Sequence, residues 1–183
     1  AVRKERERHQ RTVERLRNAV TDETLEIAYR PIVDTEGTTV GIEAGVRFID
    51  AESGVLDDVA CRELAESAGF APELGTLLLQ RTCHDITARR HEGHLRWTSV
   101  PVSPIELLTD GFVDRLARIV VANGLTSGDL WLHLCADAAV ENEERVIAII
   151  GEIRGLGIRV ALDGIGAGSS PLLLLAEIPA DGF

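Results

Sequence analysis

The sequence predicts an α/β protein: a TIM-like barrel that is incomplete and begins with one antiparallel strand. Short apolar runs alternate with helical patterns along the chain, which is the order of a mostly parallel sheet. The run at residues 160–162 is apolar throughout, as expected of a parallel strand that is covered on both faces. Short connections containing Gly or Pro separate the runs. An open doubly wound sheet is the second choice.

Residues 1–20 are expected to form a basic connector helix, and residues 21–183 a single domain. Val13, Leu16 and Val20 form one helical stripe among charged residues. Residues 1–17 contain seven Arg or Lys against three Glu, a charge of +4, so the remainder carries −15 of the net charge of −11. The chain begins with Ala and contains no Met, which suggests a piece of a longer protein with a domain upstream.

The following segment reads as a hairpin. Leu25, Ile27 and Tyr29 alternate with polar residues, so residues 25–33 predict a strand, residues 34–37 a turn and residues 39–49 a second strand. Further strands are expected at 94–102, 130–136 and 158–163, and helices at 57–69, from Pro72 onward, 111–122, 140–154 and 170–177.

A full barrel of this kind needs about 250 residues, and this sequence ends at Phe183, where another strand should begin. An open sheet leaves an unpaired edge and an exposed core face. The gap would be filled by a chain that continues past Phe183, by a partner, or by residues 1–20 folding back. We favour a dimer or a continuing chain, because the basic helix has too narrow an apolar stripe.

Composition argues against two classes of binding partner, nucleic acids and membranes. The net charge of −11 argues against nucleic acid, and no apolar run approaches the ~20 residues of a membrane span. The chain has three Cys without CxxC spacing, which predicts buried, reduced thiols in a cytoplasmic protein.

Few polar residues stand where parallel α/β folds place their sites, at the carboxyl ends of strands. Glu43 and Arg47 lie four apart on one strand, His133 lies inside an apolar run, and Asp163 ends a strand before a glycine-rich loop. Each has a structural alternative: a Glu43–Arg47 pair, a core histidine bonded to backbone, and a loop-shaping cap.

The order and spacing of several segments resemble the motifs of one family. They are residues 29–34 (YRPIVD), 41–48 (GIEAGVRF), 64–69 (LAESAG), 74–75 (LG), 100–104 (VPVSP), 132–136 (LHLCA) and 161–168 (ALDGIGAG). From about residue 20 to its end the chain therefore resembles an EAL domain, the fold of cyclic di-GMP phosphodiesterases.

The resemblance implies a two-metal site that holds Mg²⁺ or Mn²⁺ in active relatives. Glu43 and Asp163 survive at the implied ligand positions. The positions without a matching ligand are occupied by Pro101, His133, Ala136 and Gly164. The chain is therefore expected to be a degenerate, C-terminally shortened member with no functional catalytic residues and no cofactor.

The resemblance also implies a nucleotide site. Arg47 is retained there, Arg30 replaces a Gln, and Gly45 replaces a Leu. We expect a non-catalytic signalling module in cyclic di-GMP signalling that acts through protein contacts, with a protein partner or its own dimer. The alternatives are a receptor that binds cyclic di-GMP through Arg47 and Arg30 and, third, an active phosphodiesterase.

A residual metal site remains a minor expectation. Glu43, His133 and Asp163 lie on different predicted strands that would share one barrel mouth, and two carboxylates with an imidazole suit Zn²⁺ or Mn²⁺ better than Mg²⁺.

Overall fold

A computed structural model describes residues 2–89, 97–135, 143–163 and 178–182. It begins with helix α1 (Val2–Thr21) and the strands β1 (Glu26–Val33), β2 (Thr39–Asp50) and β3 (Gly54–Leu56). Then come α2 (Asp58–Ser67), α3 (Ala71–Arg89), β4 (Thr98–Val102), α4 (Pro104–Leu107) and α5 (Phe112–Ala122). The last elements are β5 (Leu130–Cys135), α7 (Glu143–Gly155) and β6 (Arg159–Asp163).

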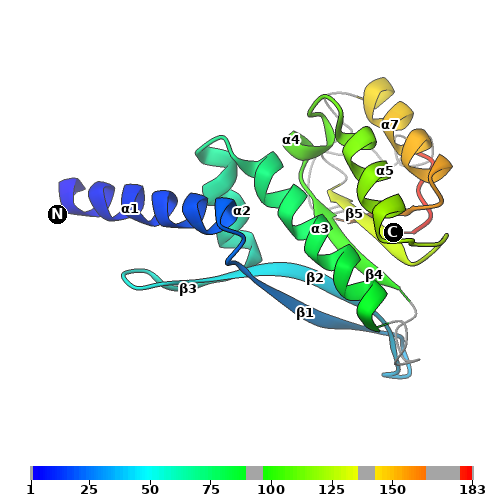
Figure 1. Cartoon of the computed structure of the whole chain (residues 1–183), viewed down its shortest axis with the longest axis horizontal. Coiled ribbons are helices and arrows are strands. Elements are labelled where there is room, and N and C mark those ends of the chain that lie inside the picture. Colours follow the sequence, from blue (N-terminus) through cyan, green and yellow to red (C-terminus); the bar gives the residue numbers. More distant parts are fainter. Residues whose placement is uncertain (1, 90–96, 136–142, 164–177, 183) are drawn as a thin grey trace.

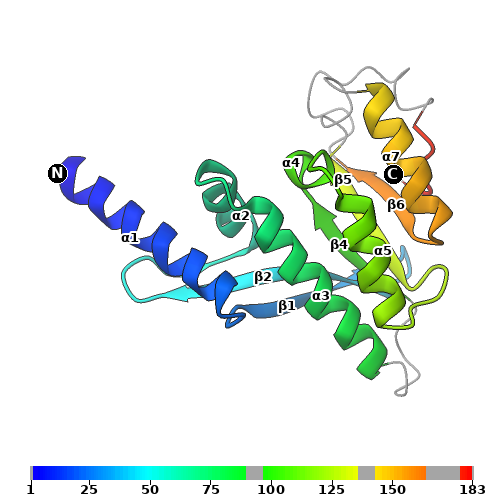
Figure 2. The same ribbon diagram turned by 45° about the horizontal axis from the view of Figure 1, so that its top comes forward.

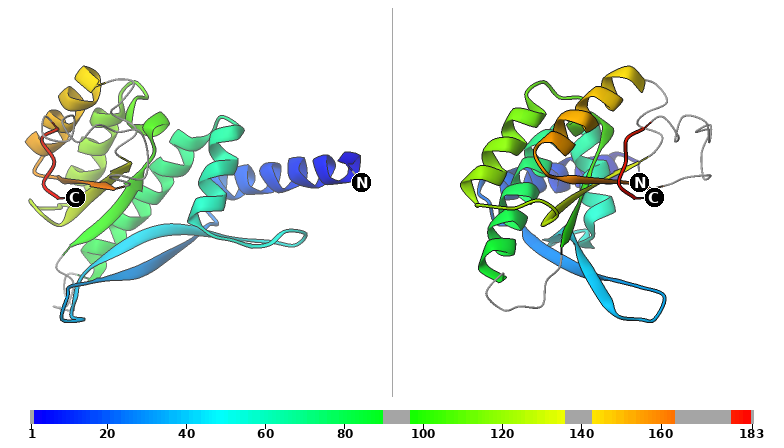
Figure 3. Two further views of the ribbon diagram at one scale, coloured as in Figure 1. Left: turned by 180° about the vertical axis from the view of Figure 1, so that it is seen from behind. Right: turned by 90° about the vertical axis from the view of Figure 1, so that its right-hand side faces the viewer.

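These elements form one mixed sheet in the order β1-β2-β4-β5-β6, with β3 paired to β2. β1 and β3 run antiparallel to β2, whereas β2, β4, β5 and β6 are parallel to one another. Helices α3, α5 and α7 lie along one face of the sheet (Figures 1 and 2). Seen from the side in Figure 3, the described strands curve as an arc and do not close into a ring. The architecture is an incomplete TIM-like barrel with one antiparallel N-terminal strand, as predicted.

The core lies between the strands and the helices. Side chains at alternate strand positions face the helices and are buried, among them Val100, Leu132 and Val160. The helices contribute a set of fully buried aliphatic side chains to the same cluster: Leu74 and Leu78 of α3, Leu116 of α5, and Ile150 and Ile153 of α7. Successive side chains of a strand point to opposite faces of the sheet. The residues between the buried ones therefore line the inner face, away from the helices.

The turn between β1 and β2 follows from its sequence. Asp34 Oδ1 accepts hydrogen bonds from the backbone N–H of Glu36 and of Thr38, both at 2.9 Å. Gly37 has φ +81°, a conformation that glycine adopts without strain. This turn sets the register in which Arg30 lies opposite Glu43.

Helix α1 is part of the domain at its C-terminal half and extends beyond it at its N-terminal half (Figure 1). Leu16, Ala19 and Val20 are buried in the core. The preceding turns are held by the β2–β3 turn: Arg15 pairs with Asp50 at 2.9 Å, and Arg11 pairs with Glu52 at 3.1 Å. The helix contacts α2, α3 and β2, so it does not fold back over the β6 end of the sheet.

The remaining expectations are met in part. Asp181 N–H donates to Val160 O, and Gly182 forms an isolated parallel bridge with Ala161, so the last described residues lie beside β6. The predicted helix at 170–177 lies outside the described residues. Cys61 and Cys83 are buried, but the prediction that all three thiols are buried is wrong for Cys135, which is exposed at the end of β5. None of the described helices has the length and apolar character that crossing a membrane would require.

Candidate functional site

The site predicted from the sequence lies on the inner face of the sheet, near the carboxyl ends of β4, β5 and β6. Glu43 lies opposite Ser99, and Pro101 lies opposite His133. Asp163 is the last residue of β6. Because side chains alternate along a strand, these residues face the side away from α3, α5 and α7. A cavity of about 660 Å³ follows this face; its lining includes Trp97 and Trp131 as well as Glu43, His133 and Asp163.

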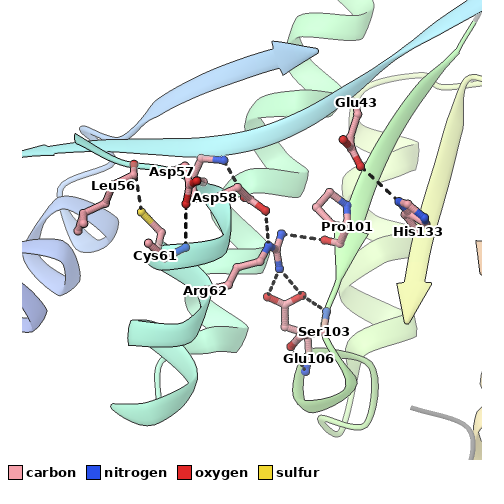
Figure 4. A network of polar contacts seen from close by, with 12 residues as sticks. Glu43, Leu56, Asp57, Asp58, Cys61, Arg62, Pro101, Ser103, Glu106 and His133 are labelled. Atoms are coloured by element: carbon pink, nitrogen blue, oxygen red, sulfur yellow. Dashed lines mark hydrogen bonds and ion pairs between the residues drawn. The ribbon is translucent and has the colours of Figure 1, made fainter. Parts of the chain in front are cut away.

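A chain of polar contacts joins four strands across this face. Arg30 Nη2 lies 2.8 Å from Glu43 Oε2, and Glu43 Oε1 lies 3.3 Å from His133 Nδ1. His133 Nε2 lies 3.4 Å from Asp163 Oδ2. The strand between β2 and β5 contributes Pro101, which has no polar side chain, so the imidazole reaches across β4 toward Glu43 (Figure 4).

Glu43, His133 and Asp163 therefore lie along one face of the sheet, but they do not converge on one point. Each imidazole nitrogen faces a different carboxylate, and a metal ion takes one nitrogen of a histidine ring. Both carboxylate oxygens of Glu43 are already in contact with cationic or imidazole nitrogens. Among the described residues, no group of three or more His, Cys, Asp or Glu side chains is placed to hold a metal ion. Among the residues that the structure describes, Glu43, His133 and Asp163 are not arranged as the single Zn²⁺ or Mn²⁺ site that the sequence suggested, nor as ligands of the Mg²⁺ or Mn²⁺ pair that the resemblance implied.

The two arginines expected to bind an anionic ligand have partners in the chain. Arg30 pairs with Glu43, and Arg47 Nη1 lies 3.6 Å from Glu26 Oε2. The alternative of a Glu43–Arg47 pair is thus replaced by two cross-strand pairs, because the hairpin register sets Glu26 opposite Arg47 and Arg30 opposite Glu43. Both arginines line a groove of about 210 Å³ together with Gly45.

That groove also contains acidic side chains from the start of α2. Asp57 caps the helix by accepting from Ala60 N–H at 3.0 Å, and Asp58 Oδ1 accepts from Val46 N–H at 2.8 Å. A Cβ atom at Gly45 would lie 3.1 Å from Asp58 Cβ. The space beside the strand at Gly45 is therefore occupied by the Asp58 side chain.

Sequence reasoning missed a buried polar network beside this groove. Arg62 donates to Asp58 at 2.9 Å and pairs with Glu106 at 3.2 Å. Burial raises the pKa of the Glu106 carboxyl, and the Arg62 charge opposes that rise. Two local signals were available: Asp58 and Arg62 are four apart on a helix, and Ser103 with Glu106 forms a capping box. Neither signal shows that the Arg62 side chain of α2 meets the Glu106 carboxylate of α4.

The chain is similar to proteins of one known family. Residues 13–183 match the family described as EAL domain. The chain is 31% identical over 170 residues to the cyclic di-GMP phosphodiesterase NbdA of Pseudomonas aeruginosa. The match covers 92% of this chain and 22% of that protein. The chain spans between 20% and 27% of the length of curated relatives that it matches.

Solved structures resemble it in fold. The phosphodiesterase PaMucR, in a complex with c-di-GMP, superposes with a TM-score of 0.84 at 25% identity, covering 92% of this chain and 69% of that one. The EAL domain of Mycobacterium smegmatis DcpA superposes with a TM-score of 0.69 at 29% identity, covering 86% of this chain and 63% of that one.

Proposed function

Because this chain belongs to the EAL domain family, we propose that it acts in cyclic di-GMP signalling without hydrolysing the nucleotide, through contacts with another protein. The observation that carries the proposal is the chain of contacts from Arg30 through Glu43 and His133 to Asp163. The two carboxylates that remain at the family's ligand positions are bound by side chains of the protein itself.

The chemistry of two-metal hydrolysis explains why this matters. Two metal ions about 4 Å apart need several hard oxygen ligands that converge on both, so that one ion activates water and the other stabilises the leaving oxygen. Pro101 supplies no ligand, and Ala136 and Gly164, known here from the sequence alone, supply none either. Glu43 and Asp163 alone do not hold two ions.

Protein contacts are supported by exposed apolar side chains on the β2–β3 ribbon and the adjoining helix. Ile49 and Val55 lie opposite each other and are 65% and 57% exposed, and Val59 at the start of α2 is 60% exposed. Val55 and Val59 line the same groove. Contiguous exposed apolar surface on a soluble domain is typical of an interface. The N-terminal half of α1, which extends beside this ribbon, adds a basic surface.

The second candidate is a receptor that binds cyclic di-GMP without cleaving it. It is favoured by the groove that brings Arg30 and Arg47 together, since guanidinium groups pair well with phosphate. Both arginines would have to exchange their present carboxylate partners for the ligand. Isothermal titration with cyclic di-GMP, with and without Mg²⁺, separates the two candidates. Saturable binding that is lost in Arg47→Ala supports the receptor. The absence of binding supports the module that acts through protein contacts.

The absence of hydrolysis is tested on purified protein incubated with cyclic di-GMP and Mg²⁺ or Mn²⁺, with chromatographic detection of linear pGpG. We expect no product above a protein-free control. Pro101→Asn alone should not start the reaction, because ligands that act as a unit are not restored one at a time. Enzyme-like product formation that disappears in Glu43→Ala would contradict the proposal.

A further inference from the structure

The sheet separates beside the candidate site. β4 and β5 are paired over five residues as far as Val102, and β5 and β6 over five as far as Asp163. β2 and β4 are paired only at Ile42–Thr98 and Glu43–Ser99. Pro101 cannot extend that ladder as a donor, since proline has no backbone N–H. Beyond Glu43, therefore, β2 is not held to β4 by the backbone.

Side chains connect the two strands where the backbone does not. Val46 N–H on β2 donates to Asp58 Oδ1 at 2.8 Å, and Asp58 Oδ2 accepts from Arg62 Nε at 2.9 Å. Arg62 Nη2 donates to the Pro101 carbonyl on β4 at 2.8 Å. Figure 4 shows this path from Asp58 through Arg62 to Pro101, which we call the Arg62 bridge. It spans the gap through the first turns of α2.

A buried carboxylate, that of Glu106, holds the Arg62 side chain of the bridge in place. Arg62 Nη1 lies 3.2 and 3.4 Å from the two oxygens of Glu106, whose residue is 3% exposed. Glu106 Oε2 also accepts from Ser103 N–H, and Ser103 Oγ accepts from Glu106 N–H. The Arg62 side chain is 13% exposed. A buried ion pair whose members are this fully hydrogen-bonded fixes geometry, because any displacement leaves a charge unpaired.

Two glycines leave room for this arrangement. A Cβ atom at Gly75 on α3 would lie 2.3 Å from Glu106 Oε1, and one at Gly45 on β2 would lie 3.1 Å from Asp58 Cβ. A larger side chain at either position would push a carboxylate of the network away from Arg62.

We propose that Arg62 is a positioning residue of the candidate site: its bridge takes the place of the missing backbone ladder and sets β2 against β4, so that Glu43 reaches His133 across Pro101. The bridge sets the shape of the site whether or not the site binds a nucleotide, so this inference goes beyond the proposed function. A purely structural Arg62 would stabilise the whole fold evenly, whereas a positioning Arg62 acts on β2 and on the Glu43–His133 contact.

The test compares Arg62→Met with Arg145→Met in the full chain. Arg145 is the matched control, because it also joins a carboxylate, Asp110, to a backbone carbonyl, that of Leu108. Amide hydrogen exchange at Val46 is measured by NMR relative to the buried amides of β5, and the ¹⁵N shifts of the His133 imidazole are recorded. In Arg62→Met we expect Val46 to exchange faster by about tenfold relative to β5, together with a change in the His133 shifts. Arg145→Met should alter neither.

Arg62→Lys covers the case in which Arg62→Met does not fold. It keeps the charge beside Glu106 and Asp58, but one ammonium group does not reproduce the planar fork that reaches both carboxylates and the Pro101 carbonyl. The same selective acceleration at Val46 is expected. Equal acceleration at Val46 and β5, or unchanged His133 shifts in the folded variant, would overturn the proposal. Neither readout depends on hydrolysis or nucleotide binding, so failure here is distinct from failure of the proposed function.

Discussion

Glu43 on β2 and His133 on β5 contact each other at 3.3 Å across a strand, β4, that lies between theirs in the sheet. The contact is available because β4 presents Pro101 at this level, opposite His133. A polar side chain there would compete for the same space and the same partners. With proline present, the imidazole bridges two carboxylates, those of Glu43 and Asp163.

Removing the imidazole should expose a cation site. In His133→Ala, Glu43 and Asp163 lose the group between them, and their mutual repulsion favours a divalent ion. We expect Mn²⁺, followed by electron paramagnetic resonance, to bind at least about tenfold more tightly than to the unaltered protein. His84→Ala, which alters an exposed histidine on α3, is the control. Equal Mn²⁺ affinity in both variants would show that His133 does not occupy the place of an ion.

Gly75→Ala should destabilise the fold although alanine is the better helix former. The new methyl group would lie 2.3 Å from Glu106 Oε1, and overpacking of this kind costs about 1–3 kcal/mol. Gly151→Ala in α7 has nothing within 4 Å of the added Cβ, so it should raise the free energy of unfolding by up to about 1 kcal/mol. Urea denaturation measures both. A stabilised Gly75→Ala would mean that Glu106 moves freely and is not anchored.

Asp50 should make the stability of the protein depend on acidic pH. Burial alone would raise the pKa of its carboxyl, but hydrogen bonds from Arg15, Ser53 and Glu52 outweigh burial and lower that pKa from 3.8 to about 2. The ionised form is therefore favoured by folding, and its contribution is present above about pH 4 and lost as the pH falls toward 2.

The comparison is between the unaltered protein and Asp50→Asn. At pH 7 the variant should be less stable by about 1–2 kcal/mol, since the bond from charged Arg15 is weakened. Urea denaturation at several pH values should show this difference shrinking between about pH 4 and pH 2. A difference that stays constant over that range would show that Asp50 does not hold α1 through its charge.

The three cysteines should differ in reactivity. Burial raises the pKa of the Cys61 thiol and that of the Cys83 thiol to about 12, so neither forms the reactive thiolate at pH 8. Cys135 is exposed. Ellman's reagent should titrate one thiol in the folded protein and all three in guanidinium. Rapid reaction of a second thiol in the folded state would mean that the core around α2 or α3 opens readily.

The elements of the fold were largely readable from local patterns. The hairpin at 25–33 and 39–49 and the strands near 130–136 and 158–163 were predicted within one or two residues, because alternation and flanking turns are properties of neighbouring residues. Two short elements were missed, β3 with three residues and α4 with four. A run that short carries no periodicity from which to predict it.

The candidate site was predictable only in part. Parallel topology was enough to predict that His133 and Asp163 lie near one edge of the sheet, since the carboxyl ends of parallel strands meet there. Glu43 lies in the middle of β2, and the short β2–β4 pairing at Glu43–Ser99 brings it alongside them. The partner of Arg47 was not predictable from spacing, because the hairpin register, and not separation along β2, sets Glu26 opposite it. The Arg62 bridge was missed because the groups that it connects and the Glu106 carboxylate that anchors it come from β2, α2, β4 and α4.

Residue identity and local spacing were enough to predict the family and the order of strands and helices. Only the tertiary structure shows that Glu43 and Asp163 contact Arg30 and His133, and that Arg62 connects β2 to β4. The physical reason is that charged side chains pair by distance in space, and the sheet register and helix packing that set those distances are properties of the whole fold.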